Sequence, residues 1–228
     1  MKRVRRFVFV TTLLATVVIS HDAAALDRLA PYRALRHTAA GDRLLEIARD
    51  VMTGGDAGGA PATATLPAKL DALPAPPPAL IVTLRNGPVT RACVGQEPPA
   101  SGDLAEAVRR LAGEARTGDR RRPPVRAEEL ESLSVVLGFA DSAIPLKHVS
   151  ELDPGREGLL IETDKGRVAF LPGEARTVSW AMREARRIGV LAGPEANARV
   201  YRFDVVTLSE PARLPVRRKE PQANAEDP

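Results

Sequence analysis

Apolar residues recur at helical spacing in three segments of the chain. Residues 42–52 carry the clearest pattern, with apolar side chains returning every three or four positions. Residues 103–115 repeat this spacing, and either Ser101 or Asp103 is placed to cap that segment. Residues 179–188 form the third stretch. These patterns predict three amphipathic helices, each burying one apolar stripe against a core.

Short β-branched and alternating segments predict strands between these helices. Asn86-Gly87 is a strong hairpin turn signal, and Asp164-Lys165-Gly166 marks a second turn. Hairpins and mixed spacing, in place of regular strand–helix alternation, favour an α+β fold with a single, mainly antiparallel sheet and flanking helices. The predicted strands are residues 80–84, 89–94, 133–139, 158–163, 167–171 and 199–208.

Residues 1–25 have the layout of a signal peptide. Their basic start is followed by an apolar run over residues 7–19 and by three consecutive alanines at positions 23–25. As a helix, that run covers only about 20 Å, which is short of a hydrocarbon core of roughly 30 Å. We therefore expect export to the periplasm or beyond, with no membrane span after cleavage. An uncleaved anchoring helix is the alternative.

The remaining chain is predicted to form one domain over residues 26–210. Residues 54–78 are rich in Pro, Gly and Ala, and we expect a long, partly extended loop there. An inter-domain linker is the alternative, although one helix before it cannot form its own core. Residues 211–228 are rich in Pro, Arg and Glu, which predicts a disordered tail.

Charge and motifs exclude several classes of function. The full chain has a net charge of +4, but four basic residues and Asp22 give the predicted signal peptide +3 of it. The mature protein is therefore close to neutral, which gives no reason to expect a nucleic-acid partner. The sequence lacks Cys-x-x-Cys, His-Glu-x-x-His and Gly-rich phosphate loops, so we expect neither a metal nor another cofactor. Its single cysteine excludes an intramolecular disulfide.

That cysteine, Cys93, is the best candidate for chemistry. Arg91 lies two residues earlier on a predicted strand, so both side chains leave the same face unless a bulge intervenes. A nearby guanidinium would stabilise the thiolate and lower the pKa of Cys93. Gly95 would let a ligand approach the backbone. The alternative is that Cys93 is a small buried apolar residue, as free cysteines often are.

Other candidate residues lie after the second predicted helix. The basic loop over residues 116–126 could bind an anion, because guanidinium groups match carboxylate and phosphate geometry. Solvated surface charge is the alternative for the loop as a whole. A nucleophilic thiol also needs a base, and His37 and His148 are the histidines left after signal removal. Each is more simply explained as a solvated side chain.

Several motifs together resemble the AMMECR domain family. Arg91-Ala92-Cys93-Val94-Gly95 is similar to its hallmark Arg-Gly-Cys-Ile-Gly, and the strand and turn ahead of it match as well. Residues 119–130 resemble the family's Asp-Pro-Arg-Phe-Pro-Pro-Leu-x-Pro-Glu-Glu-Leu segment. The later matches are Gly158-Leu159-Leu160-Ile161, Phe170-Leu171-Pro172 and Val200-Tyr201-Arg202-Phe203. The resemblance covers roughly residues 42–210.

The resemblance implies an α+β fold around one curled, largely antiparallel sheet with flanking helices. It also implies that Arg121, within the matched segment, points into a site. Prokaryotic relatives are often encoded beside a Memo-like protein and a radical SAM protein (the AmmeMemoRadiSam set), but the family's biochemical role is unsettled. This chain departs from the pattern at Ala92, Arg120, Arg122 and Gly173, where the family has Gly, Pro, Phe and Gln.

Two functional hypotheses follow from these residues. In the favoured one, the chain is an exported binding or accessory module for an envelope protein or a small anionic ligand. In the alternative, it is a thiol-assisted enzyme for a small anionic substrate. Cys93 would then be the nucleophile, Arg91 and Arg121 would hold the anion, and Glu128 or Glu129 would assist. The altered motif and the missing base favour the binding module.

Overall fold

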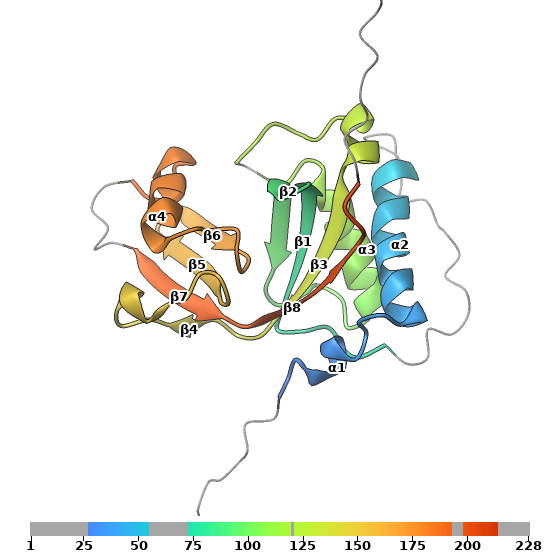
Figure 1. Ribbon diagram of the computed structural model, residues 1–228, viewed down its shortest axis with the longest axis horizontal. Coiled ribbons are helices and arrows are strands. Elements are labelled where there is room, and N and C mark those ends of the chain that lie inside the picture. The colour runs from blue at the N-terminus through green and yellow to red at the C-terminus, as the bar shows by residue number, and fades with distance from the viewer. Residues whose placement is uncertain (1–26, 55–72, 120, 193–197, 214–228) are drawn as a thin grey trace, which may run out of the picture.

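The computed structural model describes residues 27–54, 73–119, 121–192 and 198–213 (Figure 1). The predicted helices and both predicted hairpins are present. The helices are α1 (Ala30–Arg33), α2 (Ala39–Gly54), α3 (Leu104–Ala115) and α4 (Val178–Arg187), with short 3-10 helices η1 (Ala127–Ser132) and η2 (Val149–Glu151). The strands are β1 (Ala79–Asn86), β2 (Val89–Gln96), β3 (Ser134–Ala140), β4 (Ile144–Pro145), β5 (Gly158–Thr163), β6 (Gly166–Phe170), β7 (Arg199–Phe203) and β8 (Val205–Ser209).

Local sequence explains where the main elements begin and turn. Asp103 caps α3, and its carboxylate accepts a 2.7 Å hydrogen bond from the N–H of Glu106. Thr177 caps α4 in the same way through the N–H of Trp180. Gly87 has a φ of 56°, which the tight β1–β2 turn requires and which glycine adopts without strain.

The strands form two four-stranded antiparallel sheets. Sheet A has the order β2-β1-β3-β8, and sheet B has the order β4-β7-β5-β6. The predicted α+β class with antiparallel strands is confirmed. The strands lie in two sheets and not in the one expected, because the chain passes from sheet A to sheet B between β3 and β4 and returns to sheet A between β7 and β8.

A single residue separates the last two strands. The sequence predicted one strand over residues 199–208, but Asp204 interrupts it between β7 and β8. The carbonyl of Asp204 accepts a 3.0 Å hydrogen bond from the N–H of Asp141, which leaves β3. Both crossing segments are thus joined at the same point, where the chain bends from sheet A to sheet B.

Each sheet buries one face under its own helices. Leu80, Val82 and Leu84 of β1 pack in a core cluster with α2 and α3, as alternation along a strand requires. Leu159, Ile161 and Phe170 of sheet B pack under α4 in a second cluster. The other two faces are turned toward each other, and a small third cluster, with Ile81 and Phe203, joins them. Figure 1 shows the resulting order of layers, from α4 through both sheets to α2.

Some of the predicted segments lie wholly or partly outside the described residues. The predicted signal peptide lies outside the described residues, as do most of the predicted loop and residues 214–228 of the predicted tail. Gly54, the first residue of that predicted loop, is the last residue of α2, whereas residues 73–78 and 211–213 contain no helix or strand. No helix in the described ranges has the length and apolar character needed to cross a membrane.

Candidate functional site

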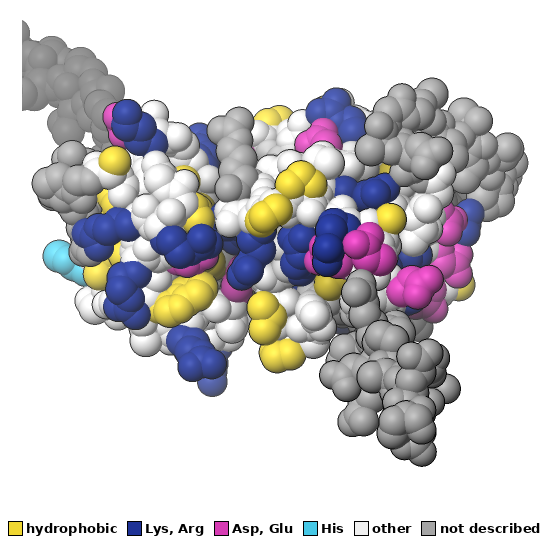
Figure 2. Space-filling view, turned by 90° about the horizontal axis from the view of Figure 1, so that it is seen from above, with side chains coloured by type: hydrophobic (Ala, Val, Ile, Leu, Met, Phe, Trp, Pro, Cys, Tyr) yellow, Lys and Arg dark blue, Asp and Glu magenta, His cyan; other side chains and the backbone are white. Residues whose placement is uncertain are grey.

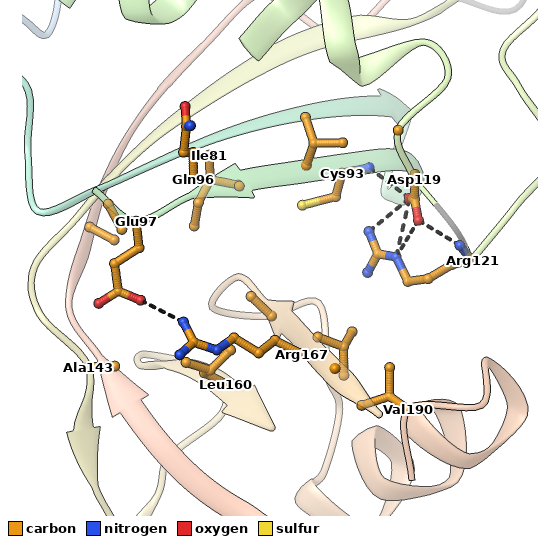
Figure 3. Close-up of a pocket in the computed structure, with 18 of the residues that line it drawn as sticks. Ile81, Cys93, Gln96, Glu97, Asp119, Arg121, Ala143, Leu160, Arg167 and Val190 are labelled. Carbon is orange, nitrogen blue, oxygen red and sulfur yellow. Dashed lines mark hydrogen bonds and ion pairs between the residues drawn. The ribbon is translucent and has the colours of Figure 1, made fainter. Parts of the chain in front are cut away.

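A cavity of about 650 Å³ lies between the facing surfaces of the two sheets (Figure 3). Sheet A contributes β1 and β2, sheet B contributes β5 and β6, and the turn after α4 closes one side. Apolar side chains form most of the wall between the charged groups, which is typical of small-molecule sites. They include Ala79, Ile81, Leu160, Val168, Ala169, Val190 and Phe203.

Cys93 and Gly95 lie on the wall that sheet A provides. The half-buried thiol of Cys93 accepts a hydrogen bond from the hydroxyl of Thr83 at 3.3 Å. Thr83 is the cross-strand partner of Cys93, and Ile81 is the partner of Gly95. These residues therefore share the face of sheet A that looks into the cavity, away from α2 and α3.

The side chain of Arg91 does not point into the cavity with that of Cys93. Leu84 pairs with Ala92 and Arg85 pairs with Thr90, so Arg91 is the extra residue of a β-bulge. Its guanidinium binds the Glu129 carboxylate at 2.6 Å and two backbone carbonyls of the following loop. The predicted convergence of Arg91 and Cys93 is therefore wrong, because the bulge turns the arginine toward η1.

Neither glutamate of η1 lines the cavity. Glu129 is held by Arg91 and also accepts from the backbone N–H of Arg126. The hydrogen bond from Arg91 lowers the pKa of Glu129 to about 2. Glu128 is exposed and lies 3.4 Å from the guanidinium of Arg126. The structure thus separates Arg91, Glu128 and Glu129 from the group formed by Cys93, Gly95 and Arg121.

Arg121 is the arginine that reaches Cys93. Its Nε and one terminal nitrogen donate to the Asp119 carboxylate at 2.9 and 3.0 Å, and the other terminal nitrogen lies 3.4 Å from Glu174. Asp119 also accepts the backbone N–H of Cys93 at 2.8 Å. The carboxylate therefore fixes both the edge of β2 and the guanidinium. Glu174, after β6, ties this group to sheet B by accepting the N–H of Leu171 at 3.1 Å.

Burial and pairing together set the charges of this group. Burial acts to raise the pKa of Asp119, but the hydrogen bonds from Arg121 outweigh it and the pKa is lowered. Burial acts to lower the pKa of Arg121, and the bonds to Asp119 outweigh it, so this pKa is raised. Both groups are therefore charged at neutral pH. One N–H on each terminal nitrogen of Arg121 has no contact with Asp119 or Glu174.

The thiol of Cys93, in contrast to Asp119 and Arg121, is uncharged at neutral pH. Burial raises its pKa to about 11, and the nearby charge of Arg121 offsets only part of that rise. The predicted lowering of this pKa is therefore wrong in direction, since removal from water disfavours the thiolate more than the guanidinium favours it. Cys93 is a neutral thiol at physiological pH.

The other end of the cavity carries charges of both signs. Glu97 follows β2, and its carboxylate pairs across the gap with Arg167 of β6 at 3.4 Å (Figure 3). Asp141 also lines this end, and Lys165 lies in the β5–β6 turn. Seen from above, Lys and Arg side chains extend across both halves of the molecule (Figure 2). This end of the cavity is therefore a mixed-charge surface, and Arg121 is the cation that contacts the thiol side of the cavity.

The described histidines lie outside the cavity, and the described residues form no metal site. His37 and His148 are exposed, and neither lines it. Among the described residues, no group of three or more His, Cys, Asp or Glu side chains is arranged to hold a metal ion. The arrangement that remains is a neutral thiol beside a fixed, charged guanidinium. It offers hydrogen-bond donors to an anion, and no described histidine is placed to act as a base on the thiol.

Sequence patterns did not predict two of the residues in this site, Asp119 and Glu174. Asp119 begins the segment that contains Arg121, and an acid two positions before a candidate anion-binding arginine could have suggested a partner. Glu174 carries no such signal, because it reaches Arg121 only through the packing of sheet B beside sheet A.

Comparison with known proteins places the chain among uncharacterised relatives. The sequence pattern of the AMMECR1 family matches residues 45–208. A protein from Thermotoga maritima is 31% identical over 117 residues, which are 50% of this chain and 67% of that protein. A protein from Methanothermobacter thermautotrophicus is 32% identical over 111 residues, 46% of this chain and 57% of that protein. The crystal structure of an uncharacterized protein from Pyrococcus horikoshii has the same fold, with a TM-score of 0.55, 21% identity and coverage of 78% of this chain and 95% of that one.

Proposed function

The chain belongs to the AMMECR1 family, and from that premise we propose that it is a binding protein whose inter-sheet cavity takes a small anionic ligand. The observation that carries this proposal is the position of Arg121 in the cavity wall. Its charge is fixed by Asp119, while one N–H on each terminal nitrogen is left for a ligand. A carboxylate or phosphate oxygen suits those donors.

The apolar walls of the cavity indicate which group the ligand carries besides its anion. Ile81, Leu160 and Ala169 give the cavity an apolar middle between its charged ends. A compact apolar group attached to the anion would bury itself there, at roughly 25 cal/mol per Å² of apolar area removed from water. A small organic carboxylate therefore fits better than a bare inorganic ion.

The thiol supports binding in preference to catalysis. With a pKa of about 11, about one Cys93 in ten thousand is a thiolate at pH 7. The thiol-assisted enzyme remains the second candidate, and the location of the sulfur beside Arg121 in the cavity wall favours it. It requires that a bound ligand or a partner protein supply the base.

Titration of the mature chain with sodium isobutyrate and with inorganic phosphate tests the proposal. Amide and arginine Nε NMR signals report on the site without any substitution. We expect saturable shifts at Cys93, Gly95 and Arg121 with isobutyrate, and smaller ones with phosphate. The Nε signal of Arg156 is the internal control and should not move, because Arg156 is exposed on a loop of sheet B away from the cavity. Unmoved cavity signals at millimolar ligand would refute the anion site.

The location of the protein is part of the proposal. The basic, apolar and small-residue segments of residues 1–25 support export. Mass spectrometry of the protein recovered from its native host provides the test. We expect a mature N-terminus near residue 26, and a chain retaining residue 1 in the cytoplasm would refute export.

A further inference from the structure

The edge of β2 that borders the cavity has unpaired backbone groups. The N–H of Cys93 donates to Asp119, so it points away from β1. In an antiparallel ladder, residues two apart direct their backbone groups to the same side. No register shift separates Cys93 from Gly95, so Gly95 also directs its N–H and C=O outward. Within the described ranges, no other backbone group pairs with the outward N–H of Gly95.

Paired charges lie at both ends of this edge, with Arg121 held by Asp119 and Glu174 at one end and Glu97 facing Arg167 at the other. Arg121 is beside Cys93, and Glu97 follows the last residue of β2 at the other end of the cavity (Figure 3). An extended chain covers about 13 Å from Cys93 to Glu97. The carboxylate of Asp141 adds a further negative charge to the wall of the cavity.

We propose that the ligand is a short peptide with free termini, which pairs with β2 as an added antiparallel strand. This inference rests on the proposed function, because it uses the same cavity and the same anion site. Main-chain pairing at a sheet edge is a common mode of peptide recognition. A span of about 13 Å corresponds to roughly three or four residues of ligand.

The charges select the direction of the peptide. A strand antiparallel to β2 has its C-terminus beside Cys93 and its N-terminus beside Glu97. Its terminal carboxylate then meets Arg121, and its terminal ammonium meets the Glu97 carboxylate. A parallel strand would place the ammonium against the guanidinium of Arg121, which is repulsive.

Gly95 also provides space for a ligand side chain. It shares the cavity face with Cys93 and Ile81, but it has no side chain of its own. The ligand residue opposite Gly95 would direct its side chain to the same face, toward Leu160 and Ala169 of sheet B. That position should therefore hold a compact apolar residue.

Binding of alanyl-valyl-alanine to the mature chain, measured by calorimetry, tests the inference. Its C-terminal amide should bind about 10- to 100-fold more weakly, because the charge-assisted hydrogen bond with Arg121 is lost. A depsipeptide with an ester in place of the N–H that faces Gly95 should bind about 3- to 10-fold more weakly. Glu97→Gln should weaken the free tripeptide and leave its N-acetyl form unchanged. Glu97 is exposed, so this variant should fold normally.

Sodium isobutyrate separates the two proposals. If isobutyrate shifts the cavity signals and the tripeptide binds no more tightly than isobutyrate, the peptide inference is overturned and the anion site stands. If neither binds, both are overturned. Equal affinities of the tripeptide and its C-terminal amide would also overturn the inference, since Arg121 would then not recognise the terminus.

Discussion

The reactivity of Cys93 gives the most direct check on the chemistry of the site. We expect alkylation by iodoacetamide in the folded protein to rise with a midpoint near pH 11, because burial raises the pKa of the thiol to about that value. At pH 7.5 about one thiol in 3,000 is then ionised, against about one in eleven for an ordinary cysteine of pKa ~8.5. The folded protein should therefore react about 300-fold more slowly than the unfolded chain.

Intact-mass spectrometry at a series of pH values, with and without guanidinium chloride, measures both rates. Steric shielding slows the reaction at every pH equally and leaves the midpoint unchanged, so the midpoint isolates the pKa of Cys93. A midpoint below pH 9, or a native rate at pH 7.5 within tenfold of the unfolded rate, would refute the reasoning. That result would favour the thiol-assisted enzyme.

Three further predictions concern stability. Asp119→Ala should lower the free energy of unfolding by about 3–5 kcal/mol in urea titrations, because it leaves a buried guanidinium without its main partner; a loss under 1 kcal/mol would contradict this. Arg49→Ala should cost about 3 kcal/mol in the same assay, since Arg49 joins α2 to two backbone carbonyls and to Glu210, and an unchanged midpoint would count against it. Acidification from pH 4.5 to 2 should lower the free energy of unfolding by about 1 kcal/mol as Glu129 protonates. The pKa of Glu129 is lower in the folded state than in the unfolded chain, so its stabilising contribution is complete only above the unfolded pKa and is lost as the pH falls. Glu129→Gln should abolish that part of the pH dependence.

Local signals in the sequence predicted most of the secondary structure. The Asn86-Gly87 turn fixed the first hairpin, because the tight turn needs a positive φ that Gly87 supplies. The periodic apolar positions predicted α2, α3 and α4 to within a few residues. Hairpins and mixed spacing indicated the α+β class, and the family resemblance singled out Arg121, which lies in the cavity wall.

Features that depend on tertiary packing could not be predicted from local sequence patterns. The bulge at Arg91 reversed the expected geometry, because one extra residue in a strand changes which side chains share a face. The break at Asp204 divided a predicted strand between two sheets, and an apolar alternation that continues across it gives no warning. Glu174 joined the site across a sheet boundary, so only the assembled fold brings it to Arg121.

The crossing of the chain between the sheets has a consequence for biosynthesis. All four strands of sheet B are made after β3, yet β3 finds its outer neighbour β8 only when residues near 208 have been synthesised. Until then the edge of β3 has free hydrogen-bonding groups, and an exposed edge of this kind invites aggregation. A nascent chain that emerges in stages therefore passes through a vulnerable interval, in which a chaperone that holds extended segments would improve the yield of native protein.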